Sequence, residues 1–293
     1  MIDRRTFLAA ALAAGACSRK SPAVPFPEES AGRFEAIRAT LGPGARLGVA
    51  AIDIGSGHEL GFDANSRYAM ASTFKLPLAA FVLALVERGE LSLDEELPFG
   101  PGDPVDNSPT VAANLALGRL PVRQLCAGIV EVSDNSAANI LLRRTGGPEA
   151  LTRFIRGCGD PVTRLDRFEM ELNTNLPDDL RDTTGPSAMA GLARKLVLGD
   201  VLGEENRTRL QTWLKKAVPG PDRLKAGLPS PPWLVGHKTG TGANGAVNDV
   251  AIAWRSGRPP IVIACYQSGG DAALPARAAA HAAVARLVAE TFG

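Results

Sequence analysis

Histidine, cysteine and aromatic residues are scarce in this 293-residue sequence, which has three histidines, four cysteines and 5% aromatic residues. The histidines (His58, His237 and His281) do not combine with the cysteines at metal-ligand spacing, so no zinc site is expected. The formal net charge is only +1 and no basic run occurs, which gives no reason to expect a nucleic-acid partner. Beyond the N-terminal segment there is no long apolar run of the kind that spans a membrane.

The N-terminus has the features of an export signal over residues 1–17. Arg4-Arg5 precedes a short apolar run, as in twin-arginine signals, and Ala14-Gly15-Ala16 forms a small-residue cleavage site. Cys17 follows at once, an arrangement that resembles a bacterial lipoprotein box. Two outcomes stay open: a lipid anchor at Cys17, or ordinary cleavage that yields a soluble protein. In both cases we expect a periplasmic location, with residues 18–29 as a proline-rich polar linker.

The other three cysteines are Cys126, Cys158 and Cys265. An exported protein can form disulfides, but three cysteines cannot all pair within one chain. Their spacing indicates no particular pair, so we expect buried or unpaired thiols.

The strand patterns lie at the two ends of the chain, and helical patterns fill the middle. With 45% hydrophobic residues, the chain is long enough for one large domain or two intimate subdomains. We therefore predict an α+β fold in which both chain ends build one antiparallel sheet flanked by the terminal helices. The sheet subdomain would comprise residues 30–66 and 216–293, and an all-helical subdomain, residues 67–215, would be inserted into it. The patterns predict strands at 46–54, 58–62, 245–254 and 260–267, and helices at 34–41, 122–132, 137–144, 187–197, 204–213 and 272–292.

Ser72 and Lys75 precede the most apolar stretch of the chain, residues 76–86. This stretch is typical of a buried helix, and Pro77 indicates that the helix begins close to Ser72. The serine and the lysine then lie on one face, one turn apart. A serine hydroxyl needs a base to become a nucleophile, and burial can lower the pKa of a lysine enough for that role. The alternative is a helix-capping serine beside a surface lysine.

Four short motifs follow one another along the chain: Ser72-Thr73-Phe74-Lys75, Ser133-Asp134-Asn135, Glu169-Met170-Glu171-Leu172-Asn173 and Lys238-Thr239-Gly240. In this order the sequence resembles a class A serine β-lactamase over essentially its whole mature length. The resemblance implies a β-lactamase/transpeptidase-like fold and an exported enzyme, expected to be a monomer without metal or organic cofactor. It would open β-lactam rings through an acyl-enzyme on Ser72 and confer β-lactam resistance.

The resemblance assigns the chemical steps to a small group of residues. Ser72 would be the nucleophile, with Lys75 or Glu169 as the base for acylation. Ser133 would relay a proton to the leaving nitrogen, or else it only caps the following helix. Glu169 and Asn173 would hold the water that hydrolyses the acyl-enzyme, on a loop closed by an Arg167–Asp182 ion pair.

Substrate binding is implied for a second group. The backbone N–H groups of Ser72 and Thr241 would form the oxyanion hole. Arg223 would stand behind the substrate carboxylate, unless it is an ordinary surface arginine. The full set of substrate-binding residues is Asn107, Asn135, Arg223, Lys238, Thr239, Gly240 and Thr241.

The sequence departs from the family pattern in several places. Met170 replaces the proline that usually follows the loop glutamate, which leaves the shape of the loop open. Asn107 replaces an aromatic at the cleft mouth, so substrate packing there should be weaker. His237 replaces the aspartate that commonly precedes Lys-Thr-Gly. Ala71 and Gly242 rule out the disulfide that some carbapenem-hydrolysing relatives have there.

Two other functions remain as alternatives. A D-alanyl-D-alanine peptidase or transpeptidase shares three of the four motifs but lacks the Glu169 loop, so its β-lactam adducts persist. A non-catalytic β-lactam sensor would be labelled by the antibiotic without turning it over.

Overall fold

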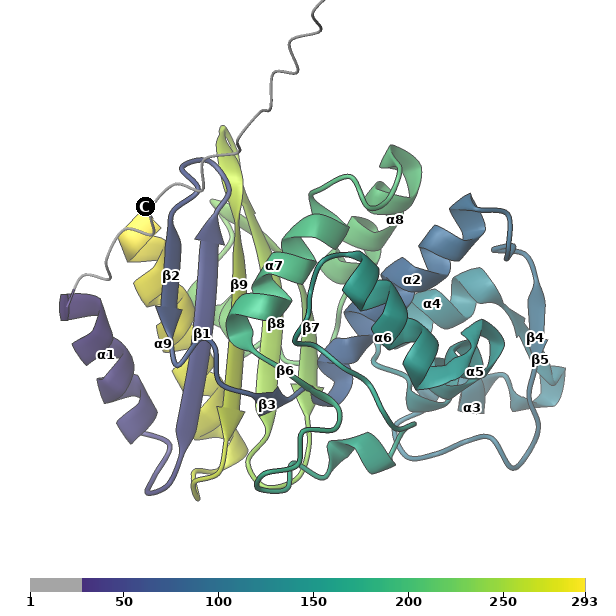
Figure 1. Cartoon of the computed structure of the whole chain (residues 1–293), viewed down its shortest axis with the longest axis horizontal. Helices are drawn as coiled ribbons and strands as arrows, with labels where there is room; N and C mark the ends of the chain where they lie inside the picture. Colours follow the sequence, from purple (N-terminus) through teal and green to yellow (C-terminus); the bar gives the residue numbers. More distant parts are fainter. Residues whose placement is uncertain (1–27, 293) are drawn as a thin grey trace, which may run out of the picture.

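The computed structural model of the protein describes residues 28–292, and its centre is a five-stranded antiparallel sheet (Figure 1). The strand order is β2-β1-β9-β8-β7. The strands are β1 (Arg46–Asp53), β2 (Glu59–Phe62), β7 (Trp233–Thr241), β8 (Val247–Arg255) and β9 (Arg258–Ser268). Because β1 pairs with β9 along its whole length, from Arg46↔Ser268 to Asp53↔Ile261, the two chain ends form one sheet as expected.

Helices cover both faces of this sheet. The terminal helices α1 (Glu28–Ala39) and α9 (Leu274–Phe292) pack together on one face, at the left of Figure 1. The other face is covered by α7 (Pro186–Val197), beyond which lies the helical part of the chain. That part contains α2 (Lys75–Glu87), α3 (Pro109–Ala113), α4 (Val122–Glu131), α5 (Asn135–Thr145), α6 (Gly147–Gly157) and α8 (Glu204–Lys215).

Two hydrophobic cores follow from this layering. The smaller lies between the sheet and the terminal helices, and includes Phe34 and Val288. The larger is built around α2, of which residues 75–85 are all buried. A helix that is apolar all round must be enclosed on every side, and α2 contacts α4, α5, α6, α7 and α8. The edge strand β7 faces the start of α2, and the candidate site forms at this junction.

Several local predictions were wrong. Helix α1 begins at Glu28, inside the segment expected to be a linker. Helix α6 was not predicted, because Gly146-Gly147 was interpreted only as a stop. Gly146 has φ +91° and ends α5, and Pro148 then stands in the first turn of α6, where its missing N–H costs nothing. Four strands of two or three residues, at 68–69, 96–98, 119–121 and 183–184, were also missed, because runs this short carry no detectable period.

The nine-residue strand β7 and the short helix α3 were also not predicted; in β7, Gly236, Lys238 and Gly240 interrupt the apolar pattern of a strand. The remaining large elements match their predicted positions within a few residues. The predicted thiols Cys126, Cys158 and Cys265 are free, as expected. The proposed export signal and Cys17 lie outside the described residues. Within residues 28–292, no helix combines the length and the hydropathy that a membrane span requires.

Candidate active site

Ser72 lies in a short 3₁₀ turn, η1 (Ala71–Phe74), that runs directly into α2. The turn and the helix place Lys75 below Ser72, and Lys75 Nζ donates a hydrogen bond to Ser72 Oγ at 2.9 Å. Lys75 is fully buried, whereas Ser72 is partly exposed. The alternative of a surface lysine beside a capping serine is therefore wrong.

The ammonium group of Lys75 is surrounded by acceptors from three parts of the chain. It is 2.9 Å from Glu169 Oε1 and 3.0 Å from the carbonyl of Ser133, and it donates to Asn135 Oδ1. Burial lowers the pKa of Lys75 below its ordinary value, and the negative charge of Glu169 opposes this shift. An amine with a lowered pKa next to a serine hydroxyl can accept the serine proton.

Ser133 lies between two buried lysines. Its backbone carbonyl accepts from Lys75, and its Oγ accepts from Lys238 Nζ at 2.9 Å. Burial, together with repulsion from Lys75, holds the pKa of Lys238 well below its ordinary value. Ser133 does not cap the following helix: Asp134 does, because its Oδ1 accepts from the backbone N–H of Ala137 at 2.7 Å.

Glu169 is held at both its side chain and its backbone. Its Oε1 is 3.5 Å from Ser72 Oγ, and its Oε2 accepts from Asn173 Nδ2 at 2.6 Å. Asn139 donates to the Glu169 carbonyl and accepts from its N–H, both at 2.9 Å. Sequence reasoning missed Asn139, although it lies one helical turn after Asn135 and therefore on the same face of α5.

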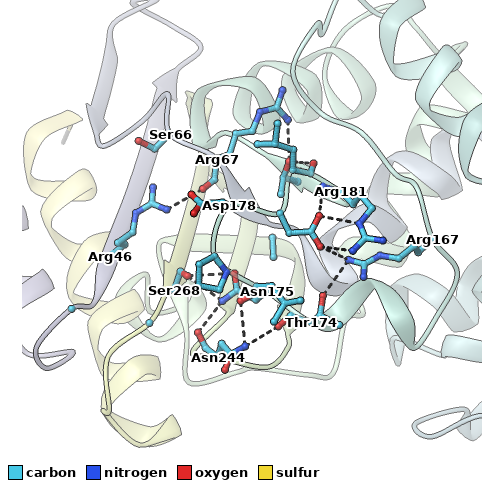
Figure 2. Close-up of a pocket in the computed structure, with 18 residues that line it drawn as sticks. Arg46, Ser66, Arg67, Arg167, Thr174, Asn175, Asp178, Arg181, Asn244 and Ser268 are labelled. Atoms are coloured by element: carbon cyan, nitrogen blue, oxygen red, sulfur yellow. Dashed lines mark hydrogen bonds and ion pairs between the residues drawn. The ribbon is translucent and has the colours of Figure 1, made fainter.

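Charged and polar contacts hold the loop that carries Glu169 in place; Figure 2 shows those that join Arg167 to Thr174 and Asn175 to Asn244. Arg167 Nε is 2.6 Å from Asp182 Oδ2, and Arg167 Nη2 reaches both Thr174 Oγ1 and Asp179 Oδ2. Asp182 is fully buried and also accepts from the backbone N–H of Arg167. Asn175 donates to the carbonyl of Asn244, which links the loop to the turn between β7 and β8. The Glu169–Met170 peptide bond is cis.

Gly240 allows β7 to approach the serine turn. A Cβ at this position would lie 2.7 Å from the carbonyl oxygen of Met70 and 3.1 Å from the backbone nitrogen of Ser72. Real side chains do not fit at the first of these distances, so another residue would push the strand away. The backbone N–H groups of Ser72 and Thr241 belong to these two closely packed segments, as a shared oxyanion hole would require.

Arg223 is buried and reaches β7 from behind. It is 6% exposed, so the surface interpretation of this residue is wrong. Its guanidinium donates to the carbonyls of Gly240 at 3.0 Å and Asn248 at 2.8 Å, and to Thr241 Oγ1 at 2.7 Å. These contacts hold Thr241 beside the cavity.

A cavity of about 310 Å³ lies between these elements. Lys75, Glu169 and Lys238 are buried around it, while Ser72 opens into it. The lining residues are Ser72, Asn107, Ser133, Asn135, Met170, Asn173, Pro219, Arg223, Thr239, Gly240 and Thr241. The cavity therefore brings together the predicted nucleophile and most of the predicted substrate-binding residues.

Two of the departures from the family pattern lie at the mouth of this cavity. Met170 is 41% exposed, and its Sδ accepts from Asn135 Nδ2 at 2.9 Å. Asn107 is exposed; it donates to the carbonyl of Ser133 and accepts from the N–H of Asn135, both at 3.0 Å. Both residues thus help to hold the Ser133–Asn135 segment, a role that sequence reasoning did not foresee.

Three residues at or next to the cavity have a strained backbone conformation. Ala71, Asn107 and Ser133 have φ of +43°, +57° and +62°, in the left-handed region that residues with a Cβ rarely adopt. Each such residue costs about 1–2 kcal/mol. Such strain persists only where the surroundings over-determine it, as they do at functional sites. In the part of the chain that the structure describes, no group of His, Cys, Asp or Glu side chains could hold a metal ion.

Comparison with known proteins gives a consistent result. The sequence model of the "Beta-lactamase enzyme family" matches residues 33–292. Beta-lactamase AST-1 of Nocardia asteroides is 42% identical over 306 residues, which cover 99% of this chain and 96% of that protein. The carbapenem-hydrolyzing beta-lactamase KPC of Klebsiella oxytoca is 41% identical over 251 residues, 85% of each chain. Among solved structures, the class A beta-lactamase reconstructed as the last common ancestor of Gram-negative bacteria (GNCA4) superimposes with a TM-score of 0.87 at 45% identity. That superposition covers 90% of this chain and 99% of the other.

Proposed function

Since the chain belongs to the class A family of β-lactamases, we propose that it hydrolyses the β-lactam amide of penicillins and cephalosporins through an acyl-enzyme on Ser72. One observation carries this assignment. Buried Lys75 lies 2.9 Å from both Ser72 Oγ and Glu169 Oε1, so the nucleophile and two candidate bases form one connected group.

Acylation forms the bond from Ser72 Oγ to the lactam carbonyl carbon. The serine proton passes to Lys75, or to Glu169 through a water, and the oxyanion is held by the N–H groups of Ser72 and Thr241. When the C–N bond breaks, Ser133 Oγ gives its proton to the leaving nitrogen. Ser133 is reprotonated from the lysines on either side of it; Lys238 already donates to its Oγ at 2.9 Å.

Deacylation requires a water activated by a base. Glu169 and Asn173 are hydrogen-bonded to each other at 2.6 Å beside Ser72, which suits them to hold that water. Glu169 takes a proton from the water as its oxygen attacks the ester carbon. The bond from that carbon to Ser72 Oγ then breaks, and Oγ takes up a proton from the neighbouring Glu169 or Lys75. The loop contacts of Arg167 and Asp182 keep Glu169 near the ester.

Substrate recognition uses the β7 side of the cavity. Lys238 attracts the substrate carboxylate electrostatically, and the hydroxyls of Thr239 and Thr241 can donate to it. Asn135 offers its amide to the acyl side chain of the antibiotic. With Asn107 in place of an aromatic at the mouth, side-chain packing supplies less of the binding energy.

Steady turnover distinguishes this function from its rivals. We expect purified protein to hydrolyse a chromogenic cephalosporin such as nitrocefin linearly over many equivalents, because Glu169 lies in position to free the acyl-enzyme. A penicillin-binding peptidase or a sensor would instead show a single stoichiometric burst and a lasting adduct. Such a burst, seen by absorbance and by intact-mass analysis, would contradict the proposal.

We also propose that the protein is exported by the twin-arginine pathway and acts in the periplasm. The support is the Arg4-Arg5 pair, the short apolar run and the small-residue site before Cys17. Replacing both arginines by lysine should leave the unprocessed protein in the cytoplasm, measured by cell fractionation and immunoblotting. Periplasmic protein from that variant would refute the pathway.

Intact-mass analysis of the wild-type protein decides between the two forms of the N-terminus. A diacylglyceryl adduct on Cys17 in the membrane fraction indicates a tethered lipoprotein. An unmodified N-terminus beyond Cys17 indicates a soluble periplasmic enzyme.

A further inference from the structure

Two buried cations, Lys238 and Arg223, lie on the β7 side of the cavity, and among the described residues neither forms an ion pair with a carboxylate. Lys238 is 1% exposed and donates only to neutral acceptors, Ser133 Oγ and the carbonyl of Thr239, each at 2.9 Å. Arg223 likewise contacts two carbonyls and a hydroxyl. Within residues 28–292, neither cation has a carboxylate oxygen within 4.0 Å. Buried charges are costly without compensation, so a counter-charge is needed nearby.

Asp249 is the buried carboxylate behind this strand. It lies on β8 opposite Thr239 and is fully buried. Both of its oxygens are 3.1 Å from His237 Nδ1, and Oδ2 accepts from the backbone N–H of Leu224 at 3.2 Å. His237 directly precedes Lys238, and Leu224 directly follows Arg223. The carboxylate is therefore tied to the backbone segments that carry both cations.

The surroundings keep Asp249 charged. Burial works to raise its pKa, but the contact with His237 and the positive charges nearby outweigh burial, and the pKa of Asp249 lies below its ordinary value. In turn, Asp249 opposes the effect of burial on the pKa of both Lys238 and Arg223. The titratable and charged groups around Asp249 are His237 and Lys238 from β7, Arg223 and Asp222 from the segment before η4 (Leu224–Gly227), His281 from α9, and Cys265 and Tyr266 from β9.

We propose that Asp249, oriented by His237, is the shared counter-charge of Lys238 and Arg223, and that it acts as a positioning residue for recognition of the substrate carboxylate. This inference rests on the proposed β-lactamase function. It also gives a role to His237, which replaces the aspartate of the family pattern. The imidazole N–H of His237 orients the Asp249 carboxylate, which faces the two cations through the sheet and does not touch the substrate.

Loss of the Asp249 charge should weaken the enzyme mainly toward substrates that carry a carboxylate. Without the negative charge of Asp249, Lys238 is the cation that can respond by losing its proton, because an arginine keeps its charge. A neutral Lys238 no longer attracts the substrate carboxylate. A merely structural role for Asp249 would instead weaken the enzyme equally toward every substrate.

The test compares a penicillin with its carboxylate methyl ester, using Asp249→Asn in the full-length enzyme. The asparagine keeps the shape and hydrogen-bond acceptor of the aspartate but removes its charge. We expect KM for the acid to rise about tenfold, the size of effect that a neighbouring charge has on ionisation. The ester should change much less. The alkaline limb of kcat/KM for the acid should move to lower pH, because Lys238 then loses its proton more readily.

Reference variants make the result decisive. Arg223→Ala, which removes a cation directly, should give the same preference for the ester over the acid. Asp160→Asn, at a buried carboxylate away from the cavity that is 5% exposed, should leave the acid-to-ester ratio unchanged. If Asp249→Asn does not fold, His237→Arg replaces it. That variant keeps Asp249 but sets a guanidinium, which stays charged, against it, and should show the same acid-selective loss.

Equal losses for acid and ester, or an alkaline limb that stays in place, would overturn the counter-charge role while leaving the proposed function intact. If the wild type hydrolyses neither compound, the proposed function itself fails. The two failures are therefore distinguishable.

Discussion

Ser72→Ala should abolish covalent labelling by a fluorescent penicillin and reduce turnover by about 10⁵-fold or more, the size of loss seen when a catalytic nucleophile is removed. The expectation follows from geometry: among the described residues 28–292, Ser72 Oγ is the only hydroxyl that both opens into the cavity and accepts from Lys75, at 2.9 Å. Gel fluorescence and nitrocefin turnover measure the two effects.

Ser187→Ala is the matched control, because Ser187 is an exposed serine at the start of α7, away from the cavity. It should label and turn over like the wild type. Ser133 is the other serine in the cavity, so peptide mapping of any residual adduct is informative. Labelling that persists at Ser133 in the Ser72→Ala variant would show that the nucleophile has been misassigned.

Glu169→Ala separates the two half-reactions. Removing this carboxylate takes away the charge that opposes the effect of burial on Lys75, so the pKa of Lys75 falls further and more of its amine is in the neutral form that can accept the serine proton. Acylation therefore continues. Deacylation loses its positioned base, and turnover should fall by at least roughly a thousandfold, about 4 kcal/mol of barrier.

The expected observation is a rapid burst followed by an acyl-enzyme that accumulates and is visible by intact-mass analysis. Glu169→Gln should behave in the same way, because an amide cannot accept the water proton. Glu171→Gln, at an exposed glutamate of the same loop, is the control and should turn over normally. A wild type that holds its penicilloyl adduct as long as Glu169→Ala does would exclude Glu169 as the deacylation base.

Most helices and strands could be predicted from the sequence because each depends on the residues of one short segment. A run of apolar residues after Pro77 predicts a buried helix, and β-rich runs at both chain ends predict strands. Ser72 and Lys75 lie three residues apart, so helix geometry alone predicts their contact. The motifs around Ser133 and Lys238 could be identified only through the family they resemble.

The burial of the site residues and their charge interactions could be learned only from the tertiary structure. Apart from the family resemblance, nothing around Glu169 in the sequence indicates that it contacts Lys75. Nor does it indicate that Glu169 lies 3.5 Å from Ser72, which is 97 residues away along the chain. Arg223 could be interpreted as a surface residue until β7 and β8 were seen to enclose it. No sequence pattern pointed to Asp249, because its role depends on cations that strand pairing brings close to it. The energy of a buried charge is set by every group within several ångströms, and those groups come from segments that only the folded chain brings together.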